Sequence, residues 1–409
     1  MYIYNVGVVG AGTMGAQIAQ VVSMAGVPVV LADVNETLAQ RGRESVRALY
    51  QARVNKGKMT PEQLEEKMLL VTAASGLAGL HQVDLVIEAV PEDVKLKKQV
   101  FHELDQICPR GAILASNTSA LSISALGAAT SRPSKVVGLH FFNPAYAMAL
   151  VEIIPGLATD PQTVDDMVGF AESIRKTPVV VKECAGFLVN RLLMPYLNEA
   201  ILCLQEAAAP VKDIDQEMVA FGMPVGPFTL LDTVGLDISL EVARILHRHY
   251  GPRMTPAPLL DALVKAGRLG VKAGHGFYDY VSAEEGGREQ GLDTVIRRVR
   301  EETGAPGTQG KWTRSRLLLA MVNEAVTALQ EGIASARDID FAMVAGIGFP
   351  VDKEGPLHFA DRLGIDQVLH ELEDFAHSLG PRFWPAPMLR RMVDAGFTGQ
   401  IAGRGFFVY

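Results

Sequence analysis

The fold is decided by Gly10-Ala11-Gly12-Thr13-Met14-Gly15, a glycine-rich stretch that follows the apolar run Val6-Gly7-Val8-Val9. The apolar run predicts a short buried strand, and residues 16–25 after the glycines predict a helix. Residues 29–33 predict a second strand that ends in Asp33, about 20 positions beyond the glycines. This order of elements predicts a βαβ unit that binds a dinucleotide.

Each part of this stretch has a physical reason. Gly10 permits the tight turn, Gly12 lets the backbone approach a pyrophosphate, and Gly15 lets the helix pack closely on the sheet. The helix N-terminus supplies N–H groups for the phosphates, so we expect cofactor contacts from Gly10, Gly12, Thr13, Met14 and Gly15. Asp33 suits the ribose hydroxyls and repels a 2′-phosphate, which favours NAD over NADP. The alternative interpretation is a glycine-rich turn with a solvated aspartate at a strand end.

Composition narrows the class of protein. A chain of 409 residues with 48% hydrophobic and 21% charged residues is typical of a soluble protein of two or three domains. The net charge of −8 disfavours a nucleic-acid partner. We find no apolar run near the ~18 residues that span a bilayer, and no leader sequence. Three cysteines without metal-type spacing favour a reduced, cytoplasmic protein without a bound metal.

The first half of the chain predicts a mostly parallel sheet covered on both faces, because its apolar runs are continuous. The further predicted strands are residues 84–90, 112–116, 135–139, 150–154 and 178–181. In such sheets ligands bind at the carboxyl ends of the strands, and Glu92, Ser119 and His140 fall just after predicted strands. Ser119 could equally cap a helix over residues 122–129.

Residues 36–68 are charged and helical in period, which predicts a helical hairpin inserted between strands. Its tip is basic, with Arg53, Lys56 and Lys58, and Thr60-Pro61-Glu62 predicts the start of its second helix. A cation cluster for an anionic substrate tail and an ordinary solvated charged face both remain open.

His140 and Glu152 lie on consecutive predicted strands and suit the oxidation of an alcohol by NAD. Histidine side chains ordinarily titrate near neutral pH and accept hydroxyl protons, and a carboxylate on the far nitrogen fixes the tautomer. Ser119 and Asn190 could hold the developing carbonyl oxygen. Each residue alone also fits a structural role, and Asn143 before Pro144 fits a turn.

Five motifs in order, GAGTMG, VIEAVPED, SNTS, GLHFFNP and GFLVNRLL, resemble the L-3-hydroxyacyl-CoA dehydrogenases of fatty-acid β-oxidation. The resemblance runs through essentially the whole chain. It implies His140 as the catalytic base, Glu152 as its orienting partner, and Ser119 and Asn190 as contacts to the substrate oxygen. The implied NAD contacts beyond the glycine turn are Asp33, Glu92, Lys97, Ser119, Asn143 and Lys272. The hairpin resembles the family's clamp for coenzyme A, with Ser45, Arg53 and Lys56 as candidates.

The second half of the chain contains an internal repeat of a helical sequence. Asn198-Glu199-Ala200 returns as Asn323-Glu324-Ala325, an offset of 125 positions. Gly251-Pro252-Arg253 returns as Gly380-Pro381-Arg382, an offset of 129 positions. The prediction is a Rossmann-type α/β domain followed by two tandem all-α domains. The predicted bounds are 1–184 with the hairpin at about 36–68, 185–281, a linker at 282–310 with one short helix, and 311–409.

The two copies differ, because Asn190 aligns with Ser315 and only the first copy follows a nucleotide-binding domain. We therefore expect no active site in the second copy. The arrangement resembles the dehydrogenase half of the multifunctional β-oxidation enzyme, whose enoyl-CoA hydratase domain we do not expect here because Met1 closely precedes the first strand. The second copy could replace the partner subunit of shorter family members, as a pseudo-symmetric pair, with a homodimer as the alternative.

The prediction is reversible, metal-free oxidation of (S)-3-hydroxyacyl-CoA to 3-oxoacyl-CoA with NAD. Three alternatives stay open: a biosynthetic 3-hydroxybutyryl-CoA dehydrogenase or acetoacetyl-CoA reductase using NADPH, a dehydrogenase of free hydroxy or sugar acids, and a non-catalytic dinucleotide-binding protein. Acyl chain length, physiological direction, oligomeric state and association with thiolase or hydratase cannot be predicted from the sequence.

Overall fold

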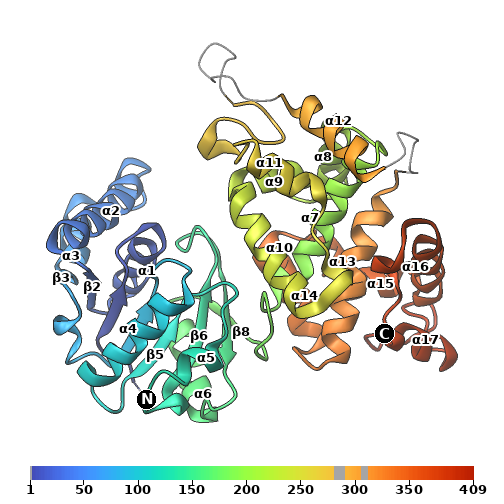
Figure 1. The fold of residues 1–409 in the computed structure, drawn as a ribbon. Helices are drawn as coiled ribbons and strands as arrows, with labels where there is room; N and C mark the ends of the chain where they lie inside the picture. Colours follow the sequence, from blue (N-terminus) through green and yellow to red (C-terminus); the bar gives the residue numbers. More distant parts are fainter. Residues whose placement is uncertain (1, 281–290, 305–311) are drawn as a thin grey trace. The chain divides into compact units, whose positions relative to one another are not determined.

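The structure, a computed structural model, describes residues 2–280, 291–304 and 312–409 (Figure 1). The chain divides into Met1–Phe187, which we name unit 1, and Leu188–Tyr409, which we name unit 2. This boundary lies three residues beyond the predicted end of the nucleotide-binding domain. Both predicted helical domains fall in unit 2, and their division within it stays a prediction.

Unit 1 is built on an eight-stranded sheet with the order β3-β2-β1-β4-β5-β6-β7-β8. Neighbouring strands run parallel except β6 and β7, which are antiparallel, as a mostly parallel sheet predicts. The strands are β1 (Val6–Val9), β2 (Val29–Asp33), β3 (Val71–Ser75), β4 (Leu85–Glu88), β5 (Ile113–Ser116), β6 (Val136–Phe141), β7 (Leu150–Pro155) and β8 (Thr177–Val180).

The helices of unit 1 begin at sequence signals for helix starts. In the hairpin of α2 and α3, Thr60 forms a capping box with Gln63, and Pro61 occupies the first turn. Asp93 caps α4 in the same way, because its side chain accepts from Leu96 N. The helices are α1 (Thr13–Met24), α2 (Glu36–Asn55), α3 (Pro61–Leu69), α4 (Val94–Ile107), α5 (Ile123–Gly127) and α6 (Pro161–Ser173), with short 3-10 helices η1 (Ala78–Leu80) and η2 (Pro133–Lys135).

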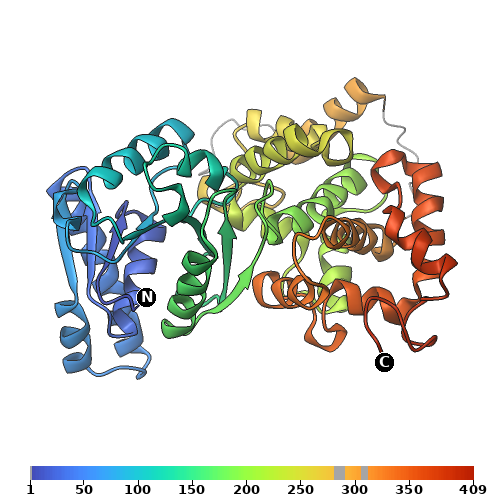
Figure 2. The same cartoon turned by 90° about the horizontal axis from the view of Figure 1, so that it is seen from below.

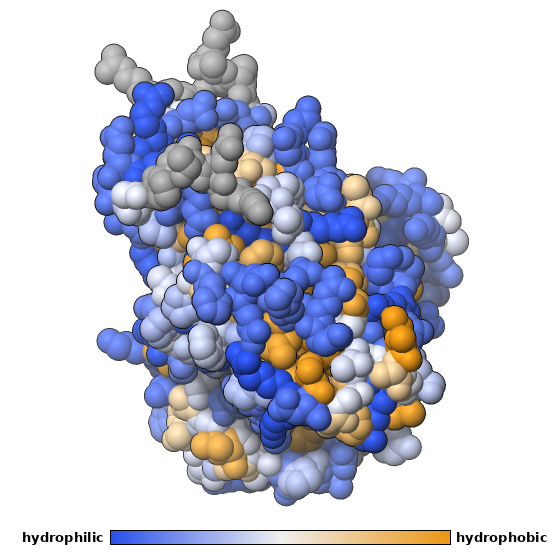
Figure 3. Space-filling view, turned by 90° about the vertical axis from the view of Figure 1, so that its right-hand side faces the viewer, coloured by the Kyte–Doolittle hydropathy of each residue, from blue (hydrophilic) through white to orange (hydrophobic). Residues whose placement is uncertain are grey.

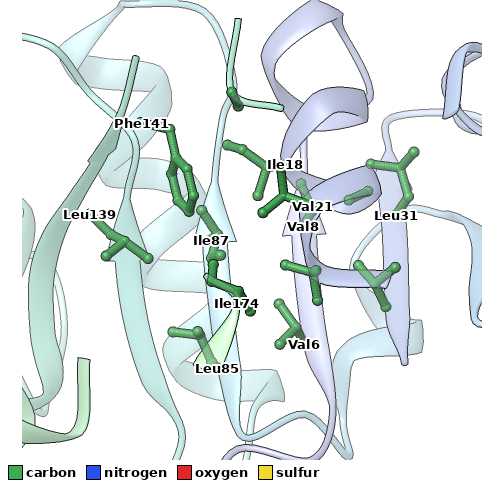
Figure 4. Close-up of a cluster of buried hydrophobic side chains, with 14 of the residues drawn as sticks. Val6, Val8, Ile18, Val21, Leu31, Leu85, Ile87, Leu139, Phe141 and Ile174 are labelled. Atoms are coloured by element: carbon green, nitrogen blue, oxygen red, sulfur yellow. The ribbon is translucent and has the colours of Figure 1, made fainter. Parts of the chain in front are cut away.

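Helices cover both faces of the sheet, as Figure 2 shows from below. Alternate residues of a strand point to opposite faces, so Val6 and Val8 of β1 join one core while Val9 joins the other. The first core packs against α1, α2, α3 and α6, and Figure 4 shows part of it around Ile18 and Phe141. The second core packs against α4 and α5. Each fully buried Val, Leu, Ile or Phe contributes roughly 1.5–3 kcal/mol.

Three local predictions were wrong or incomplete. The short edge strand β3 was missed, because Val71-Thr72-Ala73-Ala74-Ser75 is neither apolar throughout nor strictly alternating. β6 extends to Phe141, so His140 lies inside a strand and not just after it. Ser122, not Ser119, caps α5, because the Ser122 side chain accepts a hydrogen bond from Ala125 N.

Unit 2 is helical, and α12 lies within the predicted linker, whose residues 282–290 and 305–310 are outside the described residues. On the face drawn in Figure 3, hydrophobic residues lie in small groups among hydrophilic ones. In the described ranges no helix is both long and apolar enough to cross a membrane.

The helices of unit 2 are α7 (Val189–Gln205), α8 (Val211–Phe221), α9 (Pro227–Val234), α10 (Leu236–Tyr250), α11 (Pro258–Lys265), α12 (Leu292–Thr303), α13 (Arg314–Gln330), α14 (Ala336–Ile347), α15 (Pro356–Leu363), α16 (Ile365–Leu379) and α17 (Pro387–Asp394), with η3 (Gly251–Met254), η4 (Val271–Ala273), η5 (Val351–Lys353) and η6 (Pro381–Phe383).

Reciprocal ion pairs join the two halves of unit 2, where α7 packs against α13. The arginines Arg191 and Arg316 are fully buried, so each depends on its carboxylate partners. The pairs are Arg191 with Glu324 at 2.7 Å, Arg316 with Glu199 at 2.5 Å, Arg253 with Glu324 at 3.3 Å and Arg382 with Glu199 at 2.8 Å. By the offset of 125 positions Arg191 matches Arg316 and Glu199 matches Glu324, and by the offset of 129 positions Arg253 matches Arg382. The repeat therefore relates the Arg191–Glu324 pair to the Arg316–Glu199 pair, and the Arg253–Glu324 pair to the Arg382–Glu199 pair. This correspondence supports the predicted repeat.

Candidate active site

His140 and Glu152 are brought together by the antiparallel pairing of β6 and β7, which sets the two residues directly opposite each other. His140 Nδ1 lies 2.7 Å from Glu152 Oε2. Glu152 is fully buried and His140 is 6% exposed. Because Nδ1 faces the carboxylate, Nε2 is the nitrogen that remains for a substrate proton. The arrangement is that of a histidine base with an orienting carboxylate.

Aromatic rings flank this histidine. The Phe142 ring centroid lies 4.5 Å from that of His140, and the Phe187 centroid lies 5.7 Å from it. Such apolar walls exclude water, which strengthens the electrostatic interaction between the imidazole and Glu152.

Glu92 and Ser119 lie on the loops after β4 and β5, two strands that are neighbours in the sheet. Glu92 Oε1 accepts hydrogen bonds from Thr118 Oγ1 at 2.5 Å and from Ser119 N at 3.0 Å. Ser119 Oγ also donates to Glu92 at 3.3 Å. Two predicted site residues are therefore in direct contact at the carboxyl edge of the sheet.

Asn143 lies on the loop after β6, and two residues that the sequence did not point to hold this loop. Gln17 of α1 donates from Nε2 to Asn143 Oδ1 at 3.3 Å and accepts from Ala145 N at 2.6 Å. The Lys176 ammonium donates to the carbonyls of Ala145 and Met148, and burial lowers the pKa of Lys176. The sequence points only weakly to Gln17 as a residue of the site, because its partners lie 126 and 128 positions away along the chain.

The glycine turn fits a dinucleotide. Gly10 has φ +97°, and a Cβ there would lie 2.6 Å from the Ala89 carbonyl oxygen. A Cβ on Gly15 would lie 1.7 Å from the Gly10 carbonyl oxygen, so this helix position admits only glycine. At Gly12, in contrast, a Cβ would meet no atom within 4 Å, so the turn is open where a pyrophosphate approaches. Gly12 offers no side-chain cap to α1, which leaves the first N–H groups, at Thr13 and Met14, to bind phosphate.

Asp33 ends β2 beside this turn. Its Oδ2 accepts from Ala11 N and its Oδ1 accepts from Val34 N, each at 2.7 Å. The carboxylate is therefore fixed at the turn by two backbone groups, where it can bind ribose hydroxyls and repel an added phosphate.

The remaining predicted residues are more scattered. Lys97 is buried, and its ammonium binds Glu88 at 2.6 Å and the Val90 carbonyl at 3.0 Å, so direct contact with NAD stays a prediction. Ser45 and Arg53 lie on α2, and Lys56 is its C-cap residue. Asn190 lies in the first turn of α7 in unit 2, and the Lys272 ammonium pairs with Asp237 in the same unit. Within the described residues, no group of three or more His, Cys, Asp or Glu side chains could hold a metal ion.

Comparison with protein families gives two matches that cover nearly the whole chain. Residues 5–184 match the model "3-hydroxyacyl-CoA dehydrogenase, NAD binding domain". Residues 186–280 and 313–409 match the model for the C-terminal domain of the same family. The predicted fold class, a Rossmann-type α/β domain followed by helical structure, and the predicted cofactor, NAD, are thereby confirmed.

Individual relatives agree with the family models. The fatty acid oxidation complex subunit alpha of Shewanella amazonensis is 39% identical over 96% of this chain, which spans 55% of that protein's length. A solved 3-hydroxybutyryl-CoA dehydrogenase from Escherichia coli K12 is 30% identical, with a TM-score of 0.86 over 97% of this chain and 100% of that one. The dehydrogenase part of multifunctional enzyme 1 from C. elegans is 29% identical, with a TM-score of 0.66 over 96% of this chain and 90% of that one. The chain therefore belongs to the 3-hydroxyacyl-CoA dehydrogenase family and is an NAD-dependent oxidoreductase.

Proposed function

We propose that this protein oxidises (S)-3-hydroxyacyl-CoA reversibly to 3-oxoacyl-CoA in fatty-acid β-oxidation. The observation that carries the proposal is the buried hydrogen bond between His140 and Glu152, on the same sheet as the glycine turn and Asp33. A base for the hydroxyl proton and a cradle for NAD are the two parts that oxidation of a secondary alcohol requires.

In this mechanism His140 Nε2 removes the proton of the C3 hydroxyl while Glu152 holds the imidazole by Nδ1 and stabilises its positive charge. The glycine turn and Asp33 would hold NAD, which would supply the acceptor for the hydride of C3. Ser119 donates a hydrogen bond to the developing carbonyl oxygen, and the contact of Asn190 with the same oxygen stays a prediction from the family resemblance. Glu92 holds the backbone of Ser119, which orients that residue for its role.

The names of the relatives support the acyl-CoA substrate and the pathway. The Shewanella relative is named for fatty acid oxidation, and the Escherichia coli structure for a short 3-hydroxyacyl thioester. The hairpin of α2 and α3 offers cations for the phosphates of coenzyme A, because Arg53 and Lys56 lie at its end. We further propose a cytoplasmic location, where NAD and acyl-CoA are both present in bacteria, and subcellular fractionation tests it.

The test is a rate profile with NADH and 3-oxoacyl-CoA substrates of increasing length, beginning with acetoacetyl-CoA. In wild type we expect NADH oxidation with thioesters and none with the free acids. His140→Gln should lower turnover by ~10²–10⁴-fold with NADH affinity nearly unchanged. His102→Gln is the matched control, because His102 is an exposed histidine of α4. Activity on free acids alone would reverse the choice of substrate, and no NADH signal at all would favour a non-catalytic binding protein.

A second candidate is reduction of acetoacetyl-CoA in a biosynthetic direction. The high structural similarity to a 3-hydroxybutyryl-CoA dehydrogenase over its full length favours it. Steady-state kinetics with NADH and NADPH separate the two, because Asp33 should oppose the 2′-phosphate of NADPH. A preference for NADPH would support the biosynthetic function and contradict the role proposed for Asp33.

We also propose that the second half of unit 2 takes the place of a partner subunit. The reciprocal ion pairs between α7 and α13 support this. A chain that ends near Tyr280 should then dimerise or aggregate, because it exposes apolar surface that α13 covers in the full chain. A stable, fully active monomer of that length would exclude the proposal.

A further inference from the structure

A buried ion pair between Glu88 and Lys97 lies next to the candidate site. Glu88 ends β4 and is fully buried, and Lys97 of α4 is 1% exposed. The Lys97 ammonium lies 2.6 Å from Glu88 Oε1. Burying two charges is costly unless their remaining hydrogen-bonding groups are satisfied, so the partners of Glu88 show what the pair does.

The two oxygens of Glu88 are bound to the loop that follows β4 and to the last residue of β5. Oε1 accepts from Val90 N at 2.7 Å, and Oε2 accepts from Ser116 Oγ at 2.6 Å. Ser116 lies directly opposite Glu88 in the sheet, and its hydroxyl oxygen accepts from Thr118 N at 3.2 Å. One carboxylate therefore fixes the first residues of both loops.

Lys97 extends this network to the site itself. Its ammonium donates to the Val90 carbonyl at 3.0 Å and lies 3.3 Å from Glu92 Oε2. The other oxygen of Glu92 binds the backbone and hydroxyl of Ser119. The contacts thus run without a break from Glu88 through Lys97 and Glu92 to Ser119.

We infer that Glu88 is a positioning residue of this enzyme, which acts through Lys97 and Glu92 to set the place of Ser119. The inference rests on the proposed function, because it assigns Glu88 to the site in which Ser119 holds the substrate oxygen. Lys97 shares its ammonium between two carboxylates, and the contact with Glu88 is the shorter. When Glu88 loses its charge, Lys97 keeps the carboxylate of Glu92, which moves toward the ammonium and away from Ser119.

The experiment compares Glu88→Gln with Asp105→Asn. Asp105 lies near the other end of α4, where its carboxylate forms a largely buried ion pair with Arg132 at 2.8 Å. Both variants remove a charge from a buried pair that involves α4, so both should lower the melting temperature. Only Glu88→Gln should lower kcat with acetoacetyl-CoA and NADH by ~10²-fold, with a smaller change in KM, because displaced catalytic groups cost about that much.

Amide hydrogen exchange gives a second reading that does not depend on turnover. Glu88→Gln should speed exchange at residues 89–92 and 117–120, whereas Asp105→Asn should leave these loops unchanged. Where Glu88→Gln does not fold, Ser116→Ala replaces it, since this change removes only the hydroxyl that joins Glu88 to Thr118. We expect a smaller fall in kcat, of roughly 10-fold, with the same pattern of exchange.

The outcomes separate the inference from the proposed function. Equal kcat in the Glu88 variant, the Asp105 variant and wild type would overturn the positioning role while leaving the function intact. An inactive wild type would overturn the function, and the exchange data would still decide whether Glu88 orders the two loops. Faster exchange across all of unit 1 in the Glu88 variant would assign Glu88 to general stability and would also overturn the inference.

Discussion

Replacing Glu152 by glutamine tests the role of the carboxylate behind His140 most directly. Glutamine keeps the shape and the hydrogen-bonding reach of glutamate, so the fully buried site between β6 and β7 should still accept it. What it removes is the negative charge 2.7 Å from His140 Nδ1. That charge is needed when the imidazole takes the hydroxyl proton and becomes a cation.

The size of the effect follows from this geometry. With the two charge centres about 4 Å apart and an effective dielectric constant of about 20, their attraction is worth about 4 kcal/mol. A glutamine carbonyl recovers part of it by its dipole. A loss of about 3–4 kcal/mol in the transition state corresponds to a turnover lowered by ~10²–10³-fold, since each 1.36 kcal/mol is a factor of ten.

The assay is NADH formation at 340 nm with 3-hydroxybutyryl-CoA and NAD, alongside NADH binding by fluorescence titration. We expect turnover to fall by the stated factor while the dissociation constant for NADH changes less than about threefold, because Glu152 is not at the glycine turn. A variant whose turnover stays within a factor of three of wild type would refute the reasoning, because it would show that the imidazolium needs no buried countercharge.

Three further perturbations follow from the structure. Gly15→Ala should unfold unit 1 or abolish NADH binding, since its Cβ would lie 1.7 Å from the Gly10 carbonyl oxygen. Gly12→Ala should fold and lose only NADH affinity, because its Cβ would meet no atom within 4 Å. Circular dichroism and NADH titration compare the folding and the NADH affinity of the two variants, and equal results for both variants would contradict this geometry. Asp33→Ser should lower the preference for NAD over NADP by at least ~10-fold in kcat/KM, and an unchanged ratio would remove Asp33 from cofactor choice. Burial raises the pKa of Asp340 from 3.8 to about 6, so its contribution to stability is present below pH ~4 and is lost as pH rises through about 6. The unfolding free energy of Asp340→Asn, relative to that of wild type, should therefore rise by about 3 kcal/mol between pH ~4 and ~7. A difference in unfolding free energy between variant and wild type that stays constant with pH would contradict this prediction.

The parts of the site that the sequence predicted are those encoded by local pattern. The glycine turn lies between a strand and a helix that are adjacent in the chain, so its geometry follows from six residues. His140 and Glu152 lie on consecutive strands twelve positions apart, so one antiparallel pairing is enough to bring them together. In both places, local order along the chain determines the contact.

The parts that the sequence did not predict depend on tertiary packing. Glu88 lies inside the predicted strand at residues 84–90, and its partners Ser116 and Lys97 come from two other elements. An acid within a buried strand must find partners, and that is the signal that could have pointed to it. Gln17 gave no such signal, because its contacts are with a loop more than 120 positions away.

The ion pairs between α7 and α13 have a consequence for how this protein responds to dilution. Both helices belong to one polypeptide, so their association is intramolecular and does not weaken when the protein concentration falls, unlike a dimer of separate subunits. Because one gene encodes both halves, a substitution can alter one half and leave the other unchanged. His358 is an example, because the offset of 129 positions aligns it with Thr229 of the first half. Chemistry can thus be retained in one half while the other diverges at no cost to assembly.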